Sequence, residues 1–320
     1  MKHCIVAGAA GFIGQHLCRR LLEDEDVHVL AWDDLSTGLE SNLPVHPRLV
    51  FEKRDIVDLH QYIDNRTDCI FNLACPASPP EYQKDPIKTM LTNVMGTRNL
   101  LEIATRCSAV YVQASTSEVY GDPDDDHHPQ VETYYGNVNP IGVRACYDEG
   151  KRAAETLCMD YHRKHGVNIK IVRIFNTFGP GMRVDDGRVV TNFIGSALAA
   201  KPLRVYGTGK QTRTLCYVDD LVNGILRMSD ADRDIIGPVN LGGDEEISVM
   251  ELARTIVLMT GSSSEIVHVE SARDDPQQRK PHLGRAWSLL QWKPATNYID
   301  GLRRTIEHNQ HIQHIQHIYA

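Results

Sequence analysis

Several features that mark membrane, secreted or nucleic-acid-binding proteins are missing from this sequence. No apolar run reaches the ~18 residues that a membrane-spanning helix needs. The first apolar segment is too short for a signal peptide and leads directly into a glycine-rich turn. Basic residues form no block, and 34 Lys and Arg against 42 Asp and Glu give a net charge of −8. These absences predict a cytoplasmic protein with no membrane and no nucleic-acid partner.

Paired cysteines and metal-ligand clusters are missing as well. The eight cysteines are scattered without a C-x-x-C pair or a close His/Cys cluster, which indicates reduced thiols and no metal site. His308, His311, His314 and His317 recur every third residue, but histidine alone at this spacing is a weak metal signal. We interpret this tail as a polar helix end or a frayed terminus. The hydrophobic content of 42% is enough for a full globular core.

What the sequence does contain is a tyrosine and a lysine four residues apart, within NVNPIGVRACYDEGKR (137–152). On a helix this spacing places Tyr147 and Lys151 on one face, one turn apart. Tyrosine ordinarily has a pKa of about 10, and a nearby ammonium group favours the phenolate, so we expect Lys151 to lower the pKa of Tyr147. The pair predicts proton transfer from a sugar or alcohol hydroxyl. For the spacing alone, an incidental surface tyrosine beside a lysine is the alternative.

A glycine-rich turn follows the first apolar strand. Residues 3–7 lead into GAAGFIG, so that Gly8, Gly11 and Gly14 lie between a strand and a helix. Glycine there permits the tight bend and lets backbone N–H groups approach a pyrophosphate. The second strand ends at Asp33, where a carboxylate can bind both adenosine ribose hydroxyls and repel a 2′-phosphate. The pattern predicts NAD rather than NADP, with a helix cap as the alternative role of Asp33.

Strands and helices alternate through the first half of the chain. Further strands are expected at 48–55, 69–74, 109–115 and 167–176. Helices are expected over 87–106 and from the Tyr–Lys stretch to about 165. This alternation predicts a doubly wound parallel α/β sheet with helices on both faces. Functional residues should then lie at the carboxyl ends of the strands.

The regularity fades after Thr177, which predicts a smaller C-terminal α/β domain that binds the substrate. We expect a nucleotide-binding domain over 1–179, joined by returning segments at about 215–242. The substrate domain would comprise 180–214 and 243–320. Within it, Gly261 should end one helix and the last helix should begin near Tyr298.

Several motifs together resemble those of a known superfamily. GAAGFIG, STSEVYG, Tyr147-x-x-x-Lys151 and RIFNTFGP are similar to motifs of the extended short-chain dehydrogenase/reductases. Longer motifs resemble, in order, those of the UDP-glucuronate decarboxylase (UDP-xylose synthase) family: CPASPP, STSEVYGDP, NVNPIGxRACYDEGKR, DGRVV, QTRTLCYVDDLVNG, PVNLG and DDPQQRKP. The resemblance runs from the first strand to about Leu302. It implies a Rossmann-type domain that holds NAD and a C-terminal domain that grips a UDP-sugar.

The resemblance also implies a role for individual residues. Tyr147 would be the base, while Lys151 would lower its pKa and hold the nicotinamide ribose. Thr116 would form a hydrogen bond with the sugar 4-hydroxyl. Glu118 and Arg279 would act on the substrate carboxylate and on the ring carbon that bears it. The implied cofactor residues are Gly8, Gly11, Phe12, Ile13, Asp33, Asp34, Thr37, Gly38, Asp55, Ile56, Leu73, Cys75, Thr92, Tyr147, Lys151, Thr177 and Arg188. The implied substrate residues are Asn176, Tyr206, Gln211, Arg213 and Arg279.

The implied reaction begins when Tyr147 removes the proton of the 4-hydroxyl while hydride passes from C4 to NAD⁺. The 4-ketone turns the C5 carboxylate into a β-keto acid, which loses carbon dioxide because its electrons flow into an enolate. Protonation at C5 and return of the hydride would give UDP-xylose. NAD would therefore be a tightly held catalyst rather than a co-substrate. The family also implies a homodimer, formed by helices around 90–106 and 151–165.

The sequence departs from the family's motifs at three positions. Gly181 stands where relatives carry an arginine, and Leu91 stands where a lysine usually faces the substrate. Losing two cations near an acidic sugar would weaken glucuronate binding, although Arg183 is close enough in sequence to replace one. Val143 replaces a proline, a change that we regard as neutral.

Three alternatives to decarboxylation remain: a UDP-glucuronate 4-epimerase, a 4,6-dehydratase, and a nucleotide-binding protein that kept only the fold. A 4,6-dehydratase typically carries an Asp-Glu pair where this chain has Ser117-Glu118, and a 4-epimerase usually lacks the glutamate. A binding protein needs none of Thr116, Glu118, Tyr147 and Lys151. The combination favours decarboxylation.

Overall fold

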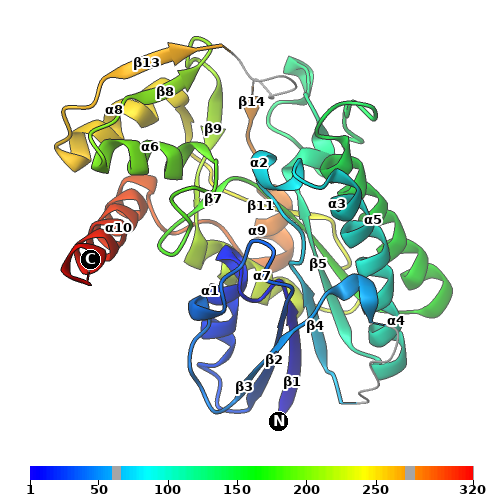
Figure 1. Cartoon of the computed structure of the whole chain (residues 1–320). Coiled ribbons are helices and arrows are strands. Elements are labelled where there is room, and N and C mark those ends of the chain that lie inside the picture. The colour runs from blue at the N-terminus through cyan, green and yellow to red at the C-terminus, as the bar shows by residue number, and fades with distance from the viewer. Residues whose placement is uncertain (60–65, 271–277, 320) are drawn as a thin grey trace.

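A parallel sheet of seven strands forms the centre of the molecule in the computed structural model, which describes residues 1–59, 66–270 and 278–319 (Figure 1). The strand order is β11-β6-β5-β4-β1-β2-β3, and every neighbouring pair is parallel. The strands are β1 (Lys2–Ala7), β2 (Val27–Asp33), β3 (Leu49–Lys53), β4 (Cys69–Asn72), β5 (Val110–Thr116), β6 (Asn168–Ile174) and β11 (Val239–Leu241). The predicted doubly wound α/β sheet is confirmed. The order changes direction between β1 and β4, where ligands bind in such sheets.

Helices cover both faces of this sheet because its strands are apolar on both sides. One face packs against α1 (Phe12–Leu21), α7 (Val218–Ser229) and α9 (Gly284–Leu290), around residues such as Leu17 and Leu221. The other face packs against α4 (Thr97–Cys107) and α5 (Ala145–His165), around residues such as Leu100 and Ile169. None of the eight cysteines forms a disulfide, and Cys4, Cys18, Cys69, Cys158 and Cys216 are buried.

The helix expected over 87–106 is present, but its middle turn is π-helical. The segment forms α3 (Pro86–Leu91), a π-helical turn (Thr92–Gly96) and then α4. The side chain of Asn93 donates to the carbonyl of Thr89 and to the Cys75 thiol, both at 3.1 Å. Gly96 lies so close to Ile56 that an added Cβ would be 2.3 Å from its Cδ1. Contacts with distant segments therefore accompany a turn that helical periodicity does not reveal.

A smaller unit is built mainly from residues after Thr177. It contains α6 (Val189–Leu198), β8 (Leu203–Tyr206), β9 (Thr212–Thr214), β12 (Glu246–Ser248), α8 (Val249–Thr260), β13 (Ile266–Val269), β14 (Gln278–Arg279) and α10 (Tyr298–Tyr319). Strand β8 pairs with β13, and β9 lies between β12 and β14. Gly261 ends α8 with φ +62°, and α10 begins at Tyr298, as predicted. A separate core joins α6, α8 and α10.

The remaining elements are short. Strand β7 (Thr177–Phe178) pairs with β10 (Cys216–Tyr217), and α2 (Pro79–Tyr82) lies between β4 and α3. The 3-10 turns are Glu40–Asn42, Ile56–Asp58, Ser117–Tyr120 and Asp125–His127. The sequence predicted neither α2 nor α9. The first four residues of the motif DDPQQRKP lie outside the described residues, whereas its Gln278 and Arg279 form β14.

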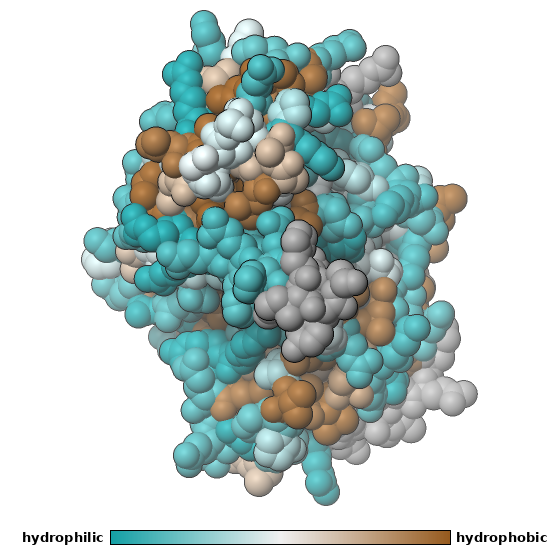
Figure 2. Space-filling view, turned by 60° about the vertical axis from the view of Figure 1, so that its left-hand side comes forward, coloured by the Kyte–Doolittle hydropathy of each residue, from teal (hydrophilic) through white to brown (hydrophobic). Residues whose placement is uncertain are grey.

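The surface is largely hydrophilic on the face that Figure 2 shows, with hydrophobic residues in several separate groups. Among the helices of the described ranges, none is long and apolar enough to cross a membrane.

Candidate active site

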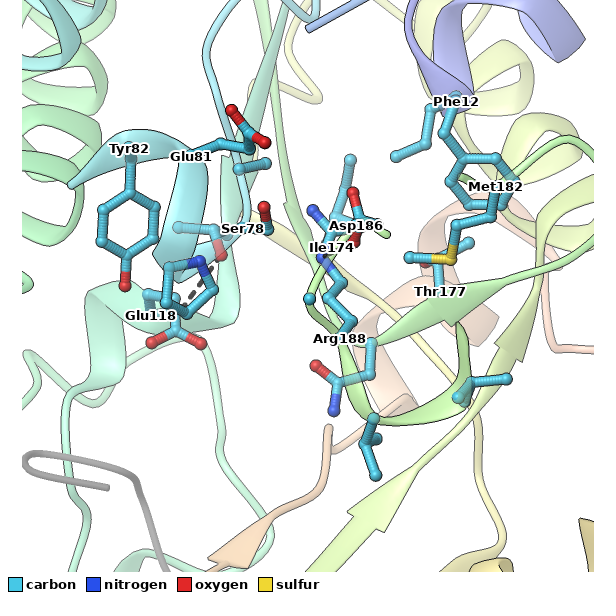
Figure 3. Close-up of a pocket in the computed structure, with 18 of the residues that line it drawn as sticks. Phe12, Ser78, Glu81, Tyr82, Glu118, Ile174, Thr177, Met182, Asp186 and Arg188 are labelled. Carbon is cyan, nitrogen blue, oxygen red and sulfur yellow. Dashed lines mark hydrogen bonds and ion pairs between the residues drawn. The ribbon is translucent and has the colours of Figure 1, made fainter. Parts of the chain in front are cut away.

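A cavity of about 590 Å³ opens at the carboxyl ends of the sheet strands, between the sheet and the smaller unit. A second cavity of about 70 Å³ shares Gly8, Gly11, Thr37, Leu73 and Cys75 with it, so the two adjoin. In Figure 3, Tyr82 and Glu118 lie on one side of the larger cavity, and Phe12, Thr177 and Met182 lie on the other. Two adjoining cavities at this place in the sheet fit a dinucleotide together with a nucleotide sugar.

The structure gathers the predicted site residues around these two cavities. Most of the predicted cofactor residues line the larger cavity, the smaller one or both. All the predicted catalytic and substrate residues line the larger one. Gly38 is the exception, because it lines neither cavity and lies behind Asp33. An added Cβ on Gly38 would be 3.0 Å from Asp33 Oδ1.

The glycine turn fits a dinucleotide in its geometry. Gly8 has φ +81°, and an added Cβ would lie 2.7 Å from the Leu73 carbonyl carbon. Gly14 is more constrained, since a Cβ would lie 2.1 Å from the Gly8 oxygen. Helix α1 begins at Phe12 with no side chain capping its first turn, which leaves N–H groups open toward an anion.

Asp33 ends β2 beside this turn. Its carboxylate accepts hydrogen bonds from the backbone N–H groups of Ala10 at 3.0 Å and Leu35 at 2.8 Å. Burial raises the pKa of Asp33, and these hydrogen bonds oppose that effect. The carboxylate therefore has a fixed orientation at the edge of the smaller cavity, which it lines.

Tyr147 and Lys151 both lie on α5 and face the larger cavity, with exposures of 6% and 5%. The Lys151 Nζ lies 5.7 Å from the Tyr147 ring centroid and donates to the Ala114 carbonyl at 2.9 Å. Burial raises the pKa of Tyr147 well above its usual value, with a further contribution from Cys75. Arg188 and a hydrogen bond with Thr116 act in the opposite direction.

The net shift is therefore upward, and Lys151 does not bring the pKa of Tyr147 below its usual value. Burial outweighs the favourable charges, because the free energy lost when a phenolate is removed from water exceeds the stabilisation that these charges provide. Burial also lowers the pKa of Lys151 itself. The spacing correctly predicted the shared helix face but not the degree of burial.

Tyr82 is a cavity residue that sequence reasoning missed. Its ring is stacked on that of Tyr147, and its side chain is only 1% exposed. The Tyr82 hydroxyl is buried without a hydrogen-bond partner among the described residues. The available sequence signal was Ser78 followed by two prolines, which is typical of a helix start.

Glu118 lies at the centre of a group of charged side chains. Its Oε2 pairs with Arg144, and its Oε1 lies 3.5 Å from Arg279 Nη1. Burial alone would raise the pKa of Glu118, but Arg279 and Arg144 lower it to about 2. Arg279 is 2% exposed and donates to the carbonyls of Ser117 and Gly121. Arg144 had not been singled out in the sequence, where it preceded the Tyr–Lys helix.

Of the two positions where a cation is missing, residue 181 lines the larger cavity, as does Arg183, whereas residue 91 does not. Leu91 is 43% exposed and lines neither cavity. Gly181 packs on α1, where the Gln15 side chain donates to its carbonyl at 3.1 Å. Arg183 pairs with Asp185 and donates to the Thr37 carbonyl at 3.2 Å, on the side of the glycine turn. The structure therefore gives no reason to count residue 91 among the substrate contacts.

The structure does not gather metal ligands in the described ranges, where no group of three or more His, Cys, Asp or Glu could hold an ion. His308, His311 and His314 lie on α10, and the side chain of His317 lies outside the described residues.

Comparison with known proteins accounts for this combination of sheet, glycine turn and Tyr–Lys helix. The model of the "NAD dependent epimerase/dehydratase family" matches residues 4–242. The chain belongs to this family. Its match spans every strand of the large sheet except the first two residues of β1, so the predicted superfamily is confirmed.

Individual members of the epimerase/dehydratase family resemble the chain over nearly its whole length. "UDP-glucuronic acid decarboxylase 5" of Arabidopsis thaliana is 48% identical over 301 residues, or 93% of this chain and 86% of that protein. An epimerase of Methanothermobacter thermautotrophicus has a TM-score of 0.89 and 28% identity, covering 98% and 94% of the two chains. UDP-glucuronic acid 4-epimerase of Bacillus cereus, solved with UDP-glucuronic acid and NAD, has a TM-score of 0.84 and 29% identity, covering 97% and 99%.

Proposed function

We propose that this protein is a UDP-glucuronate decarboxylase that uses NAD and produces UDP-xylose and carbon dioxide. The observation that carries the proposal is the 48% identity to a UDP-glucuronic acid decarboxylase across 93% of the chain. The charged group around Glu118 agrees with an acidic substrate, because two arginines line the cavity beside it. The solved 4-epimerase is a more distant relative, at 29% identity.

NAD, when bound, would supply the acceptor of the C4 hydride. Gly8, Gly11 and the first turn of α1 would hold its pyrophosphate, and Asp33 its adenosine ribose. Asp34, Asp55, Ile56 and Thr92 line the adjoining smaller cavity, where the adenosine would lie. Leu73, Cys75, Thr177 and Arg188 line the larger one, toward Tyr147.

Tyr147 would take the proton from the sugar 4-hydroxyl. Because burial raises its pKa, the phenolate needs nearby positive charge, which Lys151 and Arg188 would supply. Thr116, hydrogen-bonded to Tyr147, would accept or donate to the same sugar hydroxyl and so orient it. Asn176, Tyr206, Gln211 and Arg213 line the rest of the larger cavity and would hold the UDP.

The 4-ketone makes the loss of the carboxylate favourable. The C5–C6 bond breaks, its electron pair passes into an enolate, carbon dioxide leaves, and a proton then adds at C5. Arg279 would hold the carboxylate before this step, because its Nε is buried without a hydrogen-bond partner among the described residues. Glu118, ionised between Arg144 and Arg279, would orient both guanidinium groups rather than act as a proton donor.

Mass spectrometry of the purified protein incubated with UDP-glucuronate tests this proposal. Decarboxylation yields a product lighter than the substrate by one carbon dioxide. A product of unchanged mass would instead indicate a 4-epimerase, which is the activity named for the Bacillus cereus relative. A loss of one water, from a substrate that carries a 6-hydroxyl, would indicate a 4,6-dehydratase.

We further propose that the protein is a cytoplasmic homodimer with a substrate domain formed by 180–214 and 243–320. The lack of disulfides among the eight cysteines agrees with a reducing compartment. Helices α4 and α5 lie side by side on one face of the sheet and would pair with the same helices of a second copy. The separate core of α6, α8 and α10 supports the proposed domain, although α9 packs on β11 of the large sheet.

A further inference from the structure

Lys88 connects three segments at the smaller cavity. It lies on α3, and its Nζ is 2.6 Å from Asp34 Oδ2 and 3.5 Å from Asp55 Oδ2. Asp34 follows β2, and Asp55 follows β3. All three side chains belong to residues that line the smaller cavity. None of the steps proposed for the reaction uses Lys88.

The position of Lys88 on α3 directs it toward the space where the adenosine would lie. Thr92 lies one turn later, donates its hydroxyl hydrogen to the Lys88 carbonyl at 2.8 Å, and lines the same cavity. The Lys88 side chain therefore crosses from α3 to the carboxyl ends of two strands, over one side of the cavity. The hydrogen bond to Asp34 raises the pKa of Lys88, so the ammonium stays charged at neutral pH.

A second contact joins residues 180–188, on the other side of the cavities, to the segment that follows β2. Arg183 Nη1 donates to the carbonyl of Thr37, a residue that lines both cavities. Residues 180–188 also contact the segment that carries Lys88, because a Cβ added to Gly187 would lie 2.7 Å from Pro80 Cγ. Residues 79–91 and 180–188 thus touch each other beside the larger cavity, and each is tied to the segment that follows β2.

We propose that Lys88 is a cofactor-retaining residue, whose ion pairs with Asp34 and Asp55 close the adenosine end of the dinucleotide site and slow the release of NAD. This inference rests on the proposed NAD-dependent function. An enzyme that oxidises and then reduces the same sugar must keep its reduced cofactor until the hydride returns, because premature release would leave an oxidised sugar in the site. An ion pair across the adenosine end of the site provides such a delay at small cost in the stability of the protein.

The test measures cofactor release from the full-length protein without any UDP-sugar. The protein is loaded with NADH and mixed with lactate dehydrogenase and pyruvate, which oxidise every NADH that leaves, and the loss of absorbance gives the release rate. Lys88→Met keeps the aliphatic stem but removes both ion pairs. We expect release to become about threefold to tenfold faster, the range for breaking two partly exposed pairs.

Two further variants separate retention from a general effect of charge. Lys84→Met removes a lysine of the same segment that pairs with Glu81 at 2.7 Å and should leave the release rate unchanged. Lys88→Arg keeps the charge and should release NADH at close to the wild-type rate. Added salt should accelerate release from the wild type more than from Lys88→Met, because only the wild type has the ion pairs to screen.

Release from Lys88→Met within twofold of the wild-type rate would overturn the proposal, as would a wild type that takes up no NADH. The outcome is independent of product identity. Faster release from Lys88→Met in a protein that does not decarboxylate UDP-glucuronate would support retention and contradict the proposed reaction.

Discussion

The phenol ring of Tyr147 lies parallel to that of Tyr82, with ring centroids 5.0 Å apart and an angle of 6° between the planes. Tyr82 is held in turn by its backbone, because its carbonyl accepts the Thr89 hydroxyl at 3.1 Å and the Cys146 thiol at 3.7 Å. The proposed base is therefore positioned by two segments, its own helix α5 and the short helix α2. This stacking also helps to explain the burial that raises the pKa of Tyr147.

Replacing Tyr147 by phenylalanine keeps this stacked ring and removes the ionisable oxygen. We expect turnover of UDP-glucuronate by Tyr147→Phe to fall by at least ~100-fold, the usual contribution of a general base. Binding of UDP, measured by calorimetry, should change little. Tyr135→Phe, at a residue that is 88% exposed, serves as the control and should retain full turnover. Near-normal turnover by Tyr147→Phe would refute its assignment as the base.

Asp33 should set the preference for NAD over NADP. The 2′-phosphate of NADP would meet this carboxylate, so the wild type should bind NAD far more tightly, and Asp33→Ala should narrow the difference. Because the carboxylate also accepts two backbone hydrogen bonds, Asp33→Asn is the better matched variant, since it keeps one acceptor oxygen. Fluorescence titration with both reduced cofactors measures the preference. Equal affinities in the wild type would disprove this role.

Restoring an arginine at position 181 should not improve substrate binding. Gly181 has φ +78°, and an added Cβ would lie 3.0 Å from the Gln15 side chain. We expect Gly181→Arg to lower the free energy of unfolding by about 1–2 kcal/mol, the cost of this conformation for a residue with a Cβ. Gly195→Ala, whose added Cβ has only ordinary contacts from 3.7 Å, is the control and should not destabilise. Denaturant unfolding measures both, and a Gly181→Arg protein of unchanged stability that binds UDP-glucuronate more tightly would contradict this expectation.

Glu118 should make stability depend on pH in the acid range. Its folded-state pKa of about 2 lies below the ordinary value of 4.5. The stabilisation is therefore present above about pH 4.5 and is lost as the pH falls toward about 2. The difference of 2.5 units corresponds to at most about 3 kcal/mol. Unfolding free energies of the wild type should thus fall more steeply between about pH 5 and 3 than those of Glu118→Gln. If the unfolding free energies of the two proteins changed in parallel with pH, Arg144 and Arg279 would not be holding Glu118 ionised.

Local patterns accounted for the parts of the site that the sequence predicted. The glycine turn, the acid at the end of the second strand and the four-residue spacing of Tyr147 and Lys151 each depend on neighbours within one element or one βα unit. The parallel sheet followed from the alternation of apolar strands and helices. These features could be predicted because short-range spacing alone decides which helix face or strand end a residue occupies.

The remaining parts depend on contacts between distant segments. The partners of Glu118 come from the start of α5 and from β14, and only the folded chain brings them together. The direction of the Tyr147 pKa shift required knowledge of its burial, which the spacing to Lys151 does not contain. Similarly, the ion pairs of Lys88 with Asp34 and Asp55 join α3 to residues that follow β2 and β3, far away in the sequence.

The most direct test of the proposed reaction follows the carboxyl carbon of the substrate. UDP-glucuronate labelled with carbon-13 at C6 is incubated with the purified protein in deuterium oxide and observed by NMR. The account predicts that the label appears as carbon dioxide and bicarbonate, while UDP-xylose forms with a single deuterium at C5. A label that stays on the sugar, in UDP-galacturonate and with no carbon dioxide released, would contradict decarboxylation and identify the protein as a 4-epimerase.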